Sequence, residues 1–447
     1  MIPQAFLDQY GMIIAIVLFA LTYVLMLTFS KIRPYIALGS AVLFIATGML
    51  PLSEIWGTGI NTNNLNVILM IAGTMGLVAL FIESKMPELL ADLVMSCCSN
   101  VMVAAVALSL FAGIISAFVD NVATVLMIAP VALEICKKLK TNPVPFIIAI
   151  AVSSNLQGAA TLVGDTTAIM LGSALEMSFM DFFWYNGRPG MFFIVELGAV
   201  ISALILAFLF RKERKKKVEK IKNFTKVNDY VPSILLIALL VLLIVASFIP
   251  NMPDVTNGAI CCILLVVGLV YTWIKKKSFK AVLSPVKEID YETILLLLGL
   301  FLMIGGISAQ GVIDWLASLL VKAGGGNLFL MYTVIVWASV AISAFIDNIP
   351  YVATMIPVIG SISTVMATQM GVDAAAVAVP LYFGLLSGAT LGGNCTPIGA
   401  SANITGIGIL RKEGYTVKNG DFFKIGIPFT LAAIVPAYII IWLFFGV

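Results

Sequence analysis

The chain has 447 residues, of which 61% are hydrophobic and only 11% are charged, and its mean hydropathy is +1.08. Soluble domains carry about 25% charged residues, so this composition excludes a soluble protein and indicates an integral membrane protein. The apolar runs are continuous rather than alternating, which excludes a closed β-barrel and predicts an all-α polytopic fold. The formal net charge is only +3, so the placement of the charges is more informative than their sum.

Eight continuous apolar runs are long enough to cross the hydrocarbon core of a bilayer as helices. The first run has no basic region ahead of it, so we expect it to remain as a helix rather than to be cleaved as a signal peptide. The predicted spans cover residues 12–30, 35–51, 66–82, 190–210, 230–249, 258–274, 291–309 and 423–446.

Four further apolar regions carry Gly, Asn, Asp, Thr or Pro near their middle, which predicts helices that are broken within the membrane. Such interruptions are tolerated at membrane depth only where the backbone is buried in protein or lines a cavity. Residues 101–137 and 328–366 are predicted as re-entrant hairpins, and residues 144–175 and 374–410 as broken helices.

The basic residues predict the orientation of the chain. The longest charged run extends from Arg211 to Lys226 and holds nine Lys or Arg and two Glu. Because cytoplasmic loops of membrane proteins carry an excess of basic residues, residues 211–229 are predicted to be a cytoplasmic linker in a multi-pass protein of the cell (plasma) membrane. Both the N-terminus and the C-terminus are then expected outside.

The linker separates two related halves, residues 1–210 and 230–447. Residues 116–131 and 343–358 are identical at 8 of 16 positions without gaps, and both contain Ser-Ala-Phe-x-Asp-Asn. The charge distribution places both ends of the first hairpin inside and both ends of the second outside. The sequence therefore predicts two inverted-topology repeats with discontinuous helices, an arrangement that is typical of secondary transporters.

The tip of each predicted hairpin carries an Asp-Asn pair, Asp120-Asn121 in the first repeat and Asp347-Asn348 in the second. Asp and Asn are strong helix N-caps, so capping is the structural alternative, and it explains Asn121 as well as a function does. Capping explains the carboxylates poorly, because an ionised carboxylate at the membrane midplane costs several kcal/mol on most estimates and is normally retained for a task. We therefore expect Asp120 and Asp347 to be functional.

The two predicted broken helices are rich in Gly, Thr and Asn. Glycines allow a helix to unwind, and the freed carbonyl oxygens together with Thr and Asn side chains can coordinate a cation such as Na⁺. For any single glycine, close helix packing is the alternative. With Thr124 on the first hairpin, the candidate ion- or substrate-binding residues are Asn155, Gly158, Thr161, Gly164 and Asp165 in the first broken helix, and Gly393, Asn394, Thr396, Gly399 and Asn403 in the second.

The charge of these four motif stretches favours a cation as substrate, because they hold three Asp and no Lys or Arg. A Na⁺ site is possible at Asp120, Asn121, Asp347 and Asn348. The chain has no His, and its six Cys lack metal-ligand spacing, so no enzyme active site and no cofactor is expected beyond Na⁺ or H⁺ as coupling ions. The expected partners are a small ion and the lipid bilayer, and no nucleic acid.

At SAFVDNVATVLMIAPV, SSNLQGAATLVGD, EIDYETILLLLGLFLMIGGI, SAFIDNIPYVATMIPV and GGNCTPIGASANI the chain resembles the arsenite-permease/NhaD-type branch of the ion transporter superfamily. This branch includes the P protein and is related to the citrate-transporter-like and divalent anion/sodium symporter families. The resemblance implies a homodimer in which the hairpins and unwound helices form a transport domain that moves like an elevator against a scaffold.

Three functions remain open on this basis. Sodium–proton antiport through the midplane Asp residues is the preferred prediction. Arsenite or antimonite efflux is an alternative, although arsenite permeases usually order the tip pair as Asn-Asp. The third is Na⁺- or H⁺-coupled symport of an anion such as a dicarboxylate, citrate or sulfate.

Overall fold

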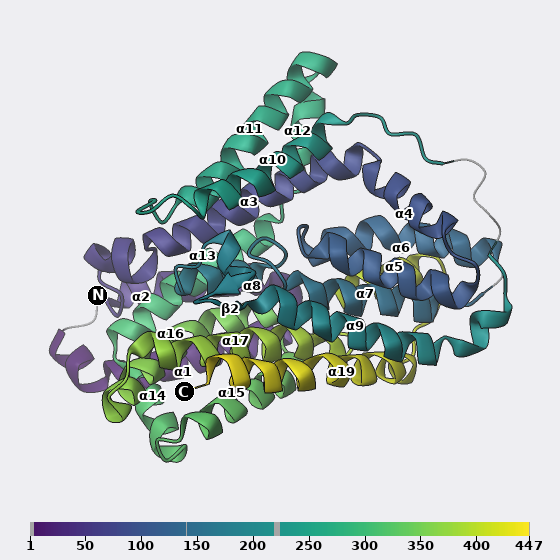
Figure 1. Ribbon diagram of the computed structural model, residues 1–447. Coiled ribbons are helices and arrows are strands. Elements are labelled where there is room, and N and C mark those ends of the chain that lie inside the picture. Colours follow the sequence, from purple (N-terminus) through teal and green to yellow (C-terminus); the bar gives the residue numbers. More distant parts are fainter. Residues whose placement is uncertain (1–3, 140, 219–223, 447) are drawn as a thin grey trace.

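The computed structural model describes residues 4–139, 141–218 and 224–446, and this part of the chain is almost entirely helical (Figure 1). A two-residue ribbon pairs β1 (Trp184–Tyr185) with β2 (Arg188–Pro189). The helices of the first half are α1 (Gln4–Thr28), α2 (Arg33–Thr47), α3 (Thr62–Glu83), α4 (Met86–Ser96), α5 (Val101–Ser116), α6 (Asn121–Lys138), α7 (Val144–Gly158), α8 (Thr166–Ala174) and α9 (Met191–Leu209).

The second half repeats this order with one additional short helix, α12. Its helices are α10 (Val231–Ala246), α11 (Thr256–Lys276), α12 (Phe279–Lys287), α13 (Tyr291–Ala309), α14 (Val312–Ala323), α15 (Leu328–Ser343), α16 (Asn348–Met370), α17 (Ala374–Gly392), α18 (Ser401–Lys412) and α19 (Asn419–Phe445). Short 3₁₀ or π turns occupy Ser30–Ile32, Leu52–Glu54, Ile55–Gly59, Phe179–Phe182, Arg211–Lys215 and Gly393–Cys395.

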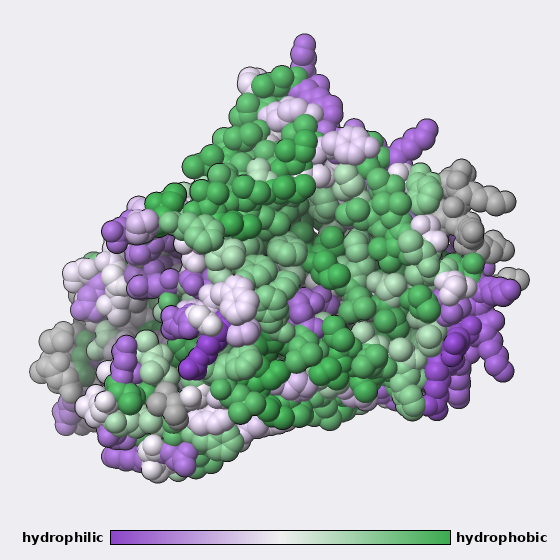
Figure 2. All heavy atoms as spheres, viewed as in Figure 1, coloured by the Kyte–Doolittle hydropathy of each residue, from purple (hydrophilic) through white to green (hydrophobic). Residues whose placement is uncertain are grey.

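Eight helices in the described residues are long and apolar enough to cross a membrane, namely α1, α3, α9, α11, α13, α16, α17 and α19. Two predicted spans are shorter than expected. Residues 35–51 form α2, which has 15 residues and ends where Gly48 adopts a left-handed conformation (φ 85°). Residues 230–249 form α10, which has 16 residues. Figure 2 shows a hydrophobic surface between hydrophilic ends, as expected of a multi-pass membrane protein.

The packing of the first helices has an internal two-fold relation. Helix α3 packs on α11 in the same way that α13 packs on α2. A Cβ atom at Gly73 would lie 2.5 Å from the carbonyl carbon of Cys261, and one at Gly299 would lie 2.7 Å from that of Ala37. Both glycines therefore permit close contact of the helix backbones. In the internal symmetry, Cys261 on α11 is thus the counterpart of Ala37 on α2.

The remaining helices form a second, equally symmetric group. Helices α5 and α6 both pack on α7, and α15 and α16 both pack on α17, while α9 packs on α19 (Figure 1). We name α5–α6 with its turn 117–120 hairpin 1, and α15–α16 with its turn 344–347 hairpin 2. Residues 159–165 between α7 and α8 are unwound segment 1, and residues 393–400 between α17 and α18 are unwound segment 2.

Candidate functional site

The Asp of each Asp-Asn pair caps the second helix of its hairpin. Oδ2 of Asp120 accepts hydrogen bonds from the backbone N–H groups of Val122 (3.0 Å) and Ala123 (3.2 Å). Oδ1 of Asp347 accepts one from the N–H of Ile349 (3.1 Å). The capping role that the sequence offered as an alternative is therefore present in both hairpins. It leaves one carboxylate oxygen of Asp120 without a described hydrogen bond.

Each unwound segment is docked on the turn of the hairpin in its own repeat. The hydroxyl of Thr161 donates to the carbonyl oxygen of Ala117, and that of Thr396 donates to the carbonyl oxygen of Ala344. Gly164 is buried against the same turn of hairpin 1, and a Cβ atom there would lie 2.5–2.7 Å from three carbonyl oxygens. These candidate residues thus support the hairpin tips through backbone contacts.

A chain of Asn side chains joins the two repeats at their centre. The amide of Asn121 donates to Oδ1 of Asn155 (3.0 Å), and the amide of Asn155 donates to Oδ1 of Asn394 (3.1 Å) and to a backbone carbonyl of α17 (2.7 Å). The amide of Asn394 donates back to the carbonyl oxygen of Val152 (3.0 Å). All three Asn are buried. Because each amide is already bonded within the protein, this chain fixes the geometry of the centre.

Asn403 also has a structural role, but one atom of its side-chain amide, Oδ1, has no hydrogen-bond partner in the described residues. Its Nδ2 donates to the carbonyl oxygens of Gly393 and Thr396, both at 3.0 Å, and so holds unwound segment 2 in place. Its Oδ1 is buried without a hydrogen-bond partner in the described residues, as is Oε1 of Gln157, which the sequence analysis did not select. Thr124 is fully buried, and within the described residues its hydroxyl makes a single, long hydrogen bond to the carbonyl oxygen of Val119 (3.5 Å).

The tips of both hairpins meet at one small cavity of about 50 Å³. It brings together four candidate residues from both repeats with residues that the sequence analysis did not select. The candidates are Asp120, Asn121, Asp165 and Asn348, and the additional polar residues are Arg33, Thr166, Asp290, Thr293 and Ser401.

The carboxylate of Asp165 is buried and accepts a hydrogen bond from the hydroxyl of Thr167 (2.6 Å). That hydroxyl lies 3.1 Å from the hydroxyl of Thr390 in the other repeat. Asp165 therefore faces the boundary between the repeats, where it shares the cavity with Asp120.

A larger cavity of about 400 Å³ adjoins the small one and shares Asp120 and Asp290 with it. It is lined by α3, α6 and α12, and its lining residue Glu83 is paired with Lys276 of the basic loop 275–277 before α12. The site is thus connected to the side of the molecule on which this loop lies.

Arg33 brings a positive charge to a site that the motif stretches predicted to be purely acidic. Its guanidinium Nη1 donates to Oδ2 of Asp347 at 2.6 Å, and Ser401 donates to the same oxygen at 3.3 Å. The motif stretches contain no basic residue, but the folded site does, because the start of α2 lies at hairpin 2. The Asp347 carboxylate is therefore paired in this structure. Asp290, the N-cap of α13, was also missed by the sequence analysis.

The described residues contain no group of three or more His, Cys, Asp or Glu arranged to hold a metal ion. The oxygen atoms around the cavity are instead a few carboxylates together with amides and hydroxyls. The Na⁺ site expected from Asp120, Asn121, Asp347 and Asn348 stays a prediction.

Two symmetric sets of helices around a polar cavity are typical of a secondary transporter rather than an enzyme. The chain belongs to the citrate transporter family, whose profile matches residues 17–384. It is 28% identical over 432 residues to an uncharacterized transporter of Mycobacterium bovis, a match that covers 96% of this chain and 98% of that protein.

The match to the P protein of Mus musculus is more distant, with 26% identity over 396 residues, and covers 72% of this chain and 47% of that protein. Together with the family match, it confirms the resemblance seen in the sequence motifs. The crystal structure of the Alcanivorax borkumensis YdaH transporter shares the fold, with a TM-score of 0.61, 12% identity and coverage of 90% of this chain and 88% of that one.

Proposed function

We propose that this transporter is a sodium–proton antiporter in which Asp120, Asp165 and, once Arg33 has left it, Asp347 bind Na⁺ and protons in alternation. The observation that supports this most directly is the charge of the buried cavity. Asp120, Asp165 and Asp290 line it, and the only basic side chain among its described lining residues, Arg33, is paired with Asp347. An excess of carboxylates in a low-dielectric site favours a cation, because unpaired buried charges are costly.

The size of the cavity supports a small substrate. A volume of about 50 Å³ compares with the roughly 10–15 Å³ of cavity that one water molecule needs. A dehydrated Na⁺ with a single water fits such a volume, whereas a tricarboxylate requires rearrangement. Protonation of the same carboxylates removes the charge that attracts Na⁺, so the two ions compete and their fluxes are coupled.

The symmetric grouping of the helices supports an elevator mechanism. In this proposal α1–α3 and α10–α13 form the scaffold, and the hairpins with α7–α9 and α17–α19 form the transport domain of each protomer in a homodimer. The linker 211–229 lies in the cytoplasm and both termini lie outside the plasma membrane. In Figure 1, α19 ends on the opposite side of the molecule from the basic turn Arg211–Lys215, which supports this orientation.

The test is Na⁺-dependent proton flux in proteoliposomes that contain a pH-sensitive dye. Asp120→Asn keeps a side chain that can cap α6 but removes the charge, so we expect correct folding and loss of exchange. The matched control is Asp373→Asn, at an exposed Asp that caps α17 through Ala375 (3.3 Å) and lies outside the cavities that contain Asp120. Normal exchange by Asp120→Asn would remove Asp120 from the mechanism.

Cation-coupled citrate symport is the second candidate, because the family is that of a citrate transporter and Arg33 brings a guanidinium to the site. The adjoining cavity of about 400 Å³ has room for a carboxylate substrate. Uptake of labelled citrate into proteoliposomes under a Na⁺ or proton gradient distinguishes the two functions. Saturable citrate uptake would favour the symporter, and its absence in vesicles that exchange Na⁺ for protons would favour the antiporter.

A further inference from the structure

The two hairpin tips differ in an ion pair. Asp347 of hairpin 2 is bonded to the guanidinium of Arg33, and the two side chains are 12% and 27% exposed. Within the described residues, the hydrogen bonds to the carboxylate of Asp120 come from backbone N–H groups alone, and no salt bridge includes it. An ion pair therefore ties only one hairpin to α2.

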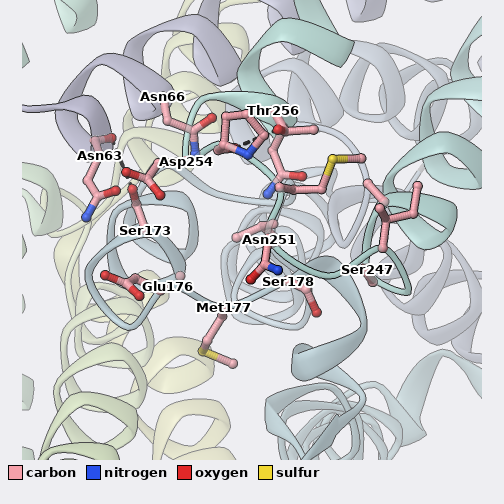
Figure 3. A pocket seen from close by; sticks show the side chains of 17 residues that line it. Asn63, Asn66, Ser173, Glu176, Met177, Ser178, Ser247, Asn251, Asp254 and Thr256 are labelled. Atoms are coloured by element: carbon pink, nitrogen blue, oxygen red, sulfur yellow. Dashed lines mark hydrogen bonds between the residues drawn. The ribbon is translucent and has the colours of Figure 1, made fainter.

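The internal symmetry shows that the second repeat has no basic residue at the position equivalent to Arg33. Because the crossings at Gly73 and Gly299 relate Cys261 to Ala37, the position that matches Arg33, four residues earlier, is Asn257. Asn257 lines a separate polar cavity of about 250 Å³. Figure 3 shows the side chains of this cavity, among them Asn63, Asn66 and Asp254, and none of its described lining residues is basic.

In transporters built from inverted repeats the inward- and outward-open states exchange the environments of the two repeats, here because the transport domain moves against a scaffold that also contains part of each repeat. Applied here, the opposite state separates Asp347 from Arg33 and brings Asp120 towards Asn257. The Arg33–Asp347 pair is then specific to the state seen in this structure, in which the large cavity reaches Asp120 from the side of the basic loop before α12.

We propose that Arg33 is a tethered counter-cation. Its guanidinium is paired with the carboxylate of Asp347 when no transported cation is bound. This ion pair must break before hairpin 2 can move. A guanidinium keeps its charge at all relevant pH values, and a partly buried carboxylate that loses its only cationic partner is strongly destabilised. The pair therefore opposes movement of the empty carrier until a cation or a proton replaces Arg33 at Asp347. This coupling rests on the proposed cation transport.

A second contact places the start of α16 against the same part of the scaffold. The hydroxyl of Tyr23 on α1 donates to the carbonyl oxygen of Pro350 (2.7 Å) and is hydrogen-bonded to the hydroxyl of Thr354. Because this bond is neutral, an incoming cation does not compete for it. It positions hairpin 2, whereas Arg33 makes its release sensitive to ions.

The first test is hydrogen–deuterium exchange of the purified full-length protein without Na⁺. In Arg33→Gln, we expect the amides of residues 344–352 to exchange about fivefold faster, the upper end of the range for an exposed ion pair. Residues 117–125, the matching part of hairpin 1, should be unchanged. Arg33→Lys should show a smaller effect, and Lys31→Gln, at an exposed basic residue two positions earlier, should show none.

Unchanged exchange in Arg33→Gln would overturn the proposal, and so would equal acceleration in both hairpins, since that indicates general loosening. If Arg33→Gln does not fold, Asp347→Asn removes the pair from the other side and should accelerate the same residues. These outcomes do not depend on which ion is transported.

The second test is the apparent Na⁺ affinity, measured by thermal shift. Without the competing guanidinium, Arg33→Gln should bind Na⁺ about fivefold more tightly, while its turnover in proteoliposomes falls. Equal or weaker Na⁺ binding by this variant would refute the role as counter-cation. A wild-type protein that binds no Na⁺ would contradict the proposed antiport instead, and the exchange experiment would still decide whether Arg33 holds hairpin 2.

Discussion

Gly164 and its counterpart Gly399 provide a quantitative test of how the unwound segments dock on the hairpins. A Cβ atom at Gly164 would lie 2.5 Å from the carbonyl oxygen of Gly158 and 2.7 Å from those of Ser116 and Ala117. At Gly399 the equivalent distances, to carbonyl oxygens in unwound segment 2 and hairpin 2, are 2.6–2.8 Å. Since all of these neighbours are backbone atoms, they cannot rotate away as a side chain could.

The expected cost follows from this geometry. Overpacking in a tight core typically costs about 1–3 kcal/mol, and contact with three backbone oxygens places Gly164→Ala at the upper end, about 3 kcal/mol. With an unfolding entropy of about 2.1 cal/mol/K per residue over 447 residues, this corresponds to a decrease in Tm of about 3 °C. Gly399→Ala should behave in the same way.

The assay is thermal unfolding of the detergent-solubilised protein, followed by intrinsic fluorescence. The matched control is Gly408→Ala in α18, where no atom lies within 4 Å of the added Cβ. In an exposed or open helical position this change is expected to stabilise by about 0.5–1 kcal/mol. If Gly164→Ala unfolds at the same temperature as Gly408→Ala, the close docking of unwound segment 1 on hairpin 1 is refuted.

Two further substitutions test the energetic roles of polar contacts. Asn403→Ala removes both hydrogen bonds to the carbonyl oxygens of Gly393 and Thr396. Because these buried carbonyls lose their partner, the free energy of unfolding should fall by about 2–4 kcal/mol. A decrease below about 1 kcal/mol in denaturant titration would contradict this. Lys137→Ala removes an ion pair with Glu413 whose side chains are 48% and 44% exposed, so denaturant titration should detect a change within about 0.5 kcal/mol, and a larger one would show that the pair is not simply a surface contact.

Much of the architecture was predictable because it depends on local sequence. Long apolar runs specify spans through the cost of placing polar groups in lipid, and the all-α polytopic fold is confirmed. The repeated Ser-Ala-Phe-x-Asp-Asn stretch marks where α6 and α16 begin, since an Asp at the start of a helix caps it wherever it lies. The resemblance to citrate transporter-like proteins is confirmed by the family match.

The roles of individual residues within the unwound segments were less predictable. Gly and Thr allow a helix to break, but the sequence does not show what the broken segment contacts. Only the structure shows that Thr161 and Gly164 support the turn of hairpin 1 and that Asn155 bonds Asn121. Each of these contacts joins segments that are more than 30 residues apart, so no local pattern reports it.

The amino-acid sequence by itself determined the membrane class, the repeats and three of the acidic residues around the site. The tertiary structure alone decided the charge balance of that site, because Arg33 and Asp347 are 314 positions apart and meet only when α2 packs beside hairpin 2. Local periodicity and motif spacing carry no information about such a meeting. A pairing between distant side chains is set by how the helices pack, and here it neutralises one of the two carboxylates that the sequence presents as equivalent.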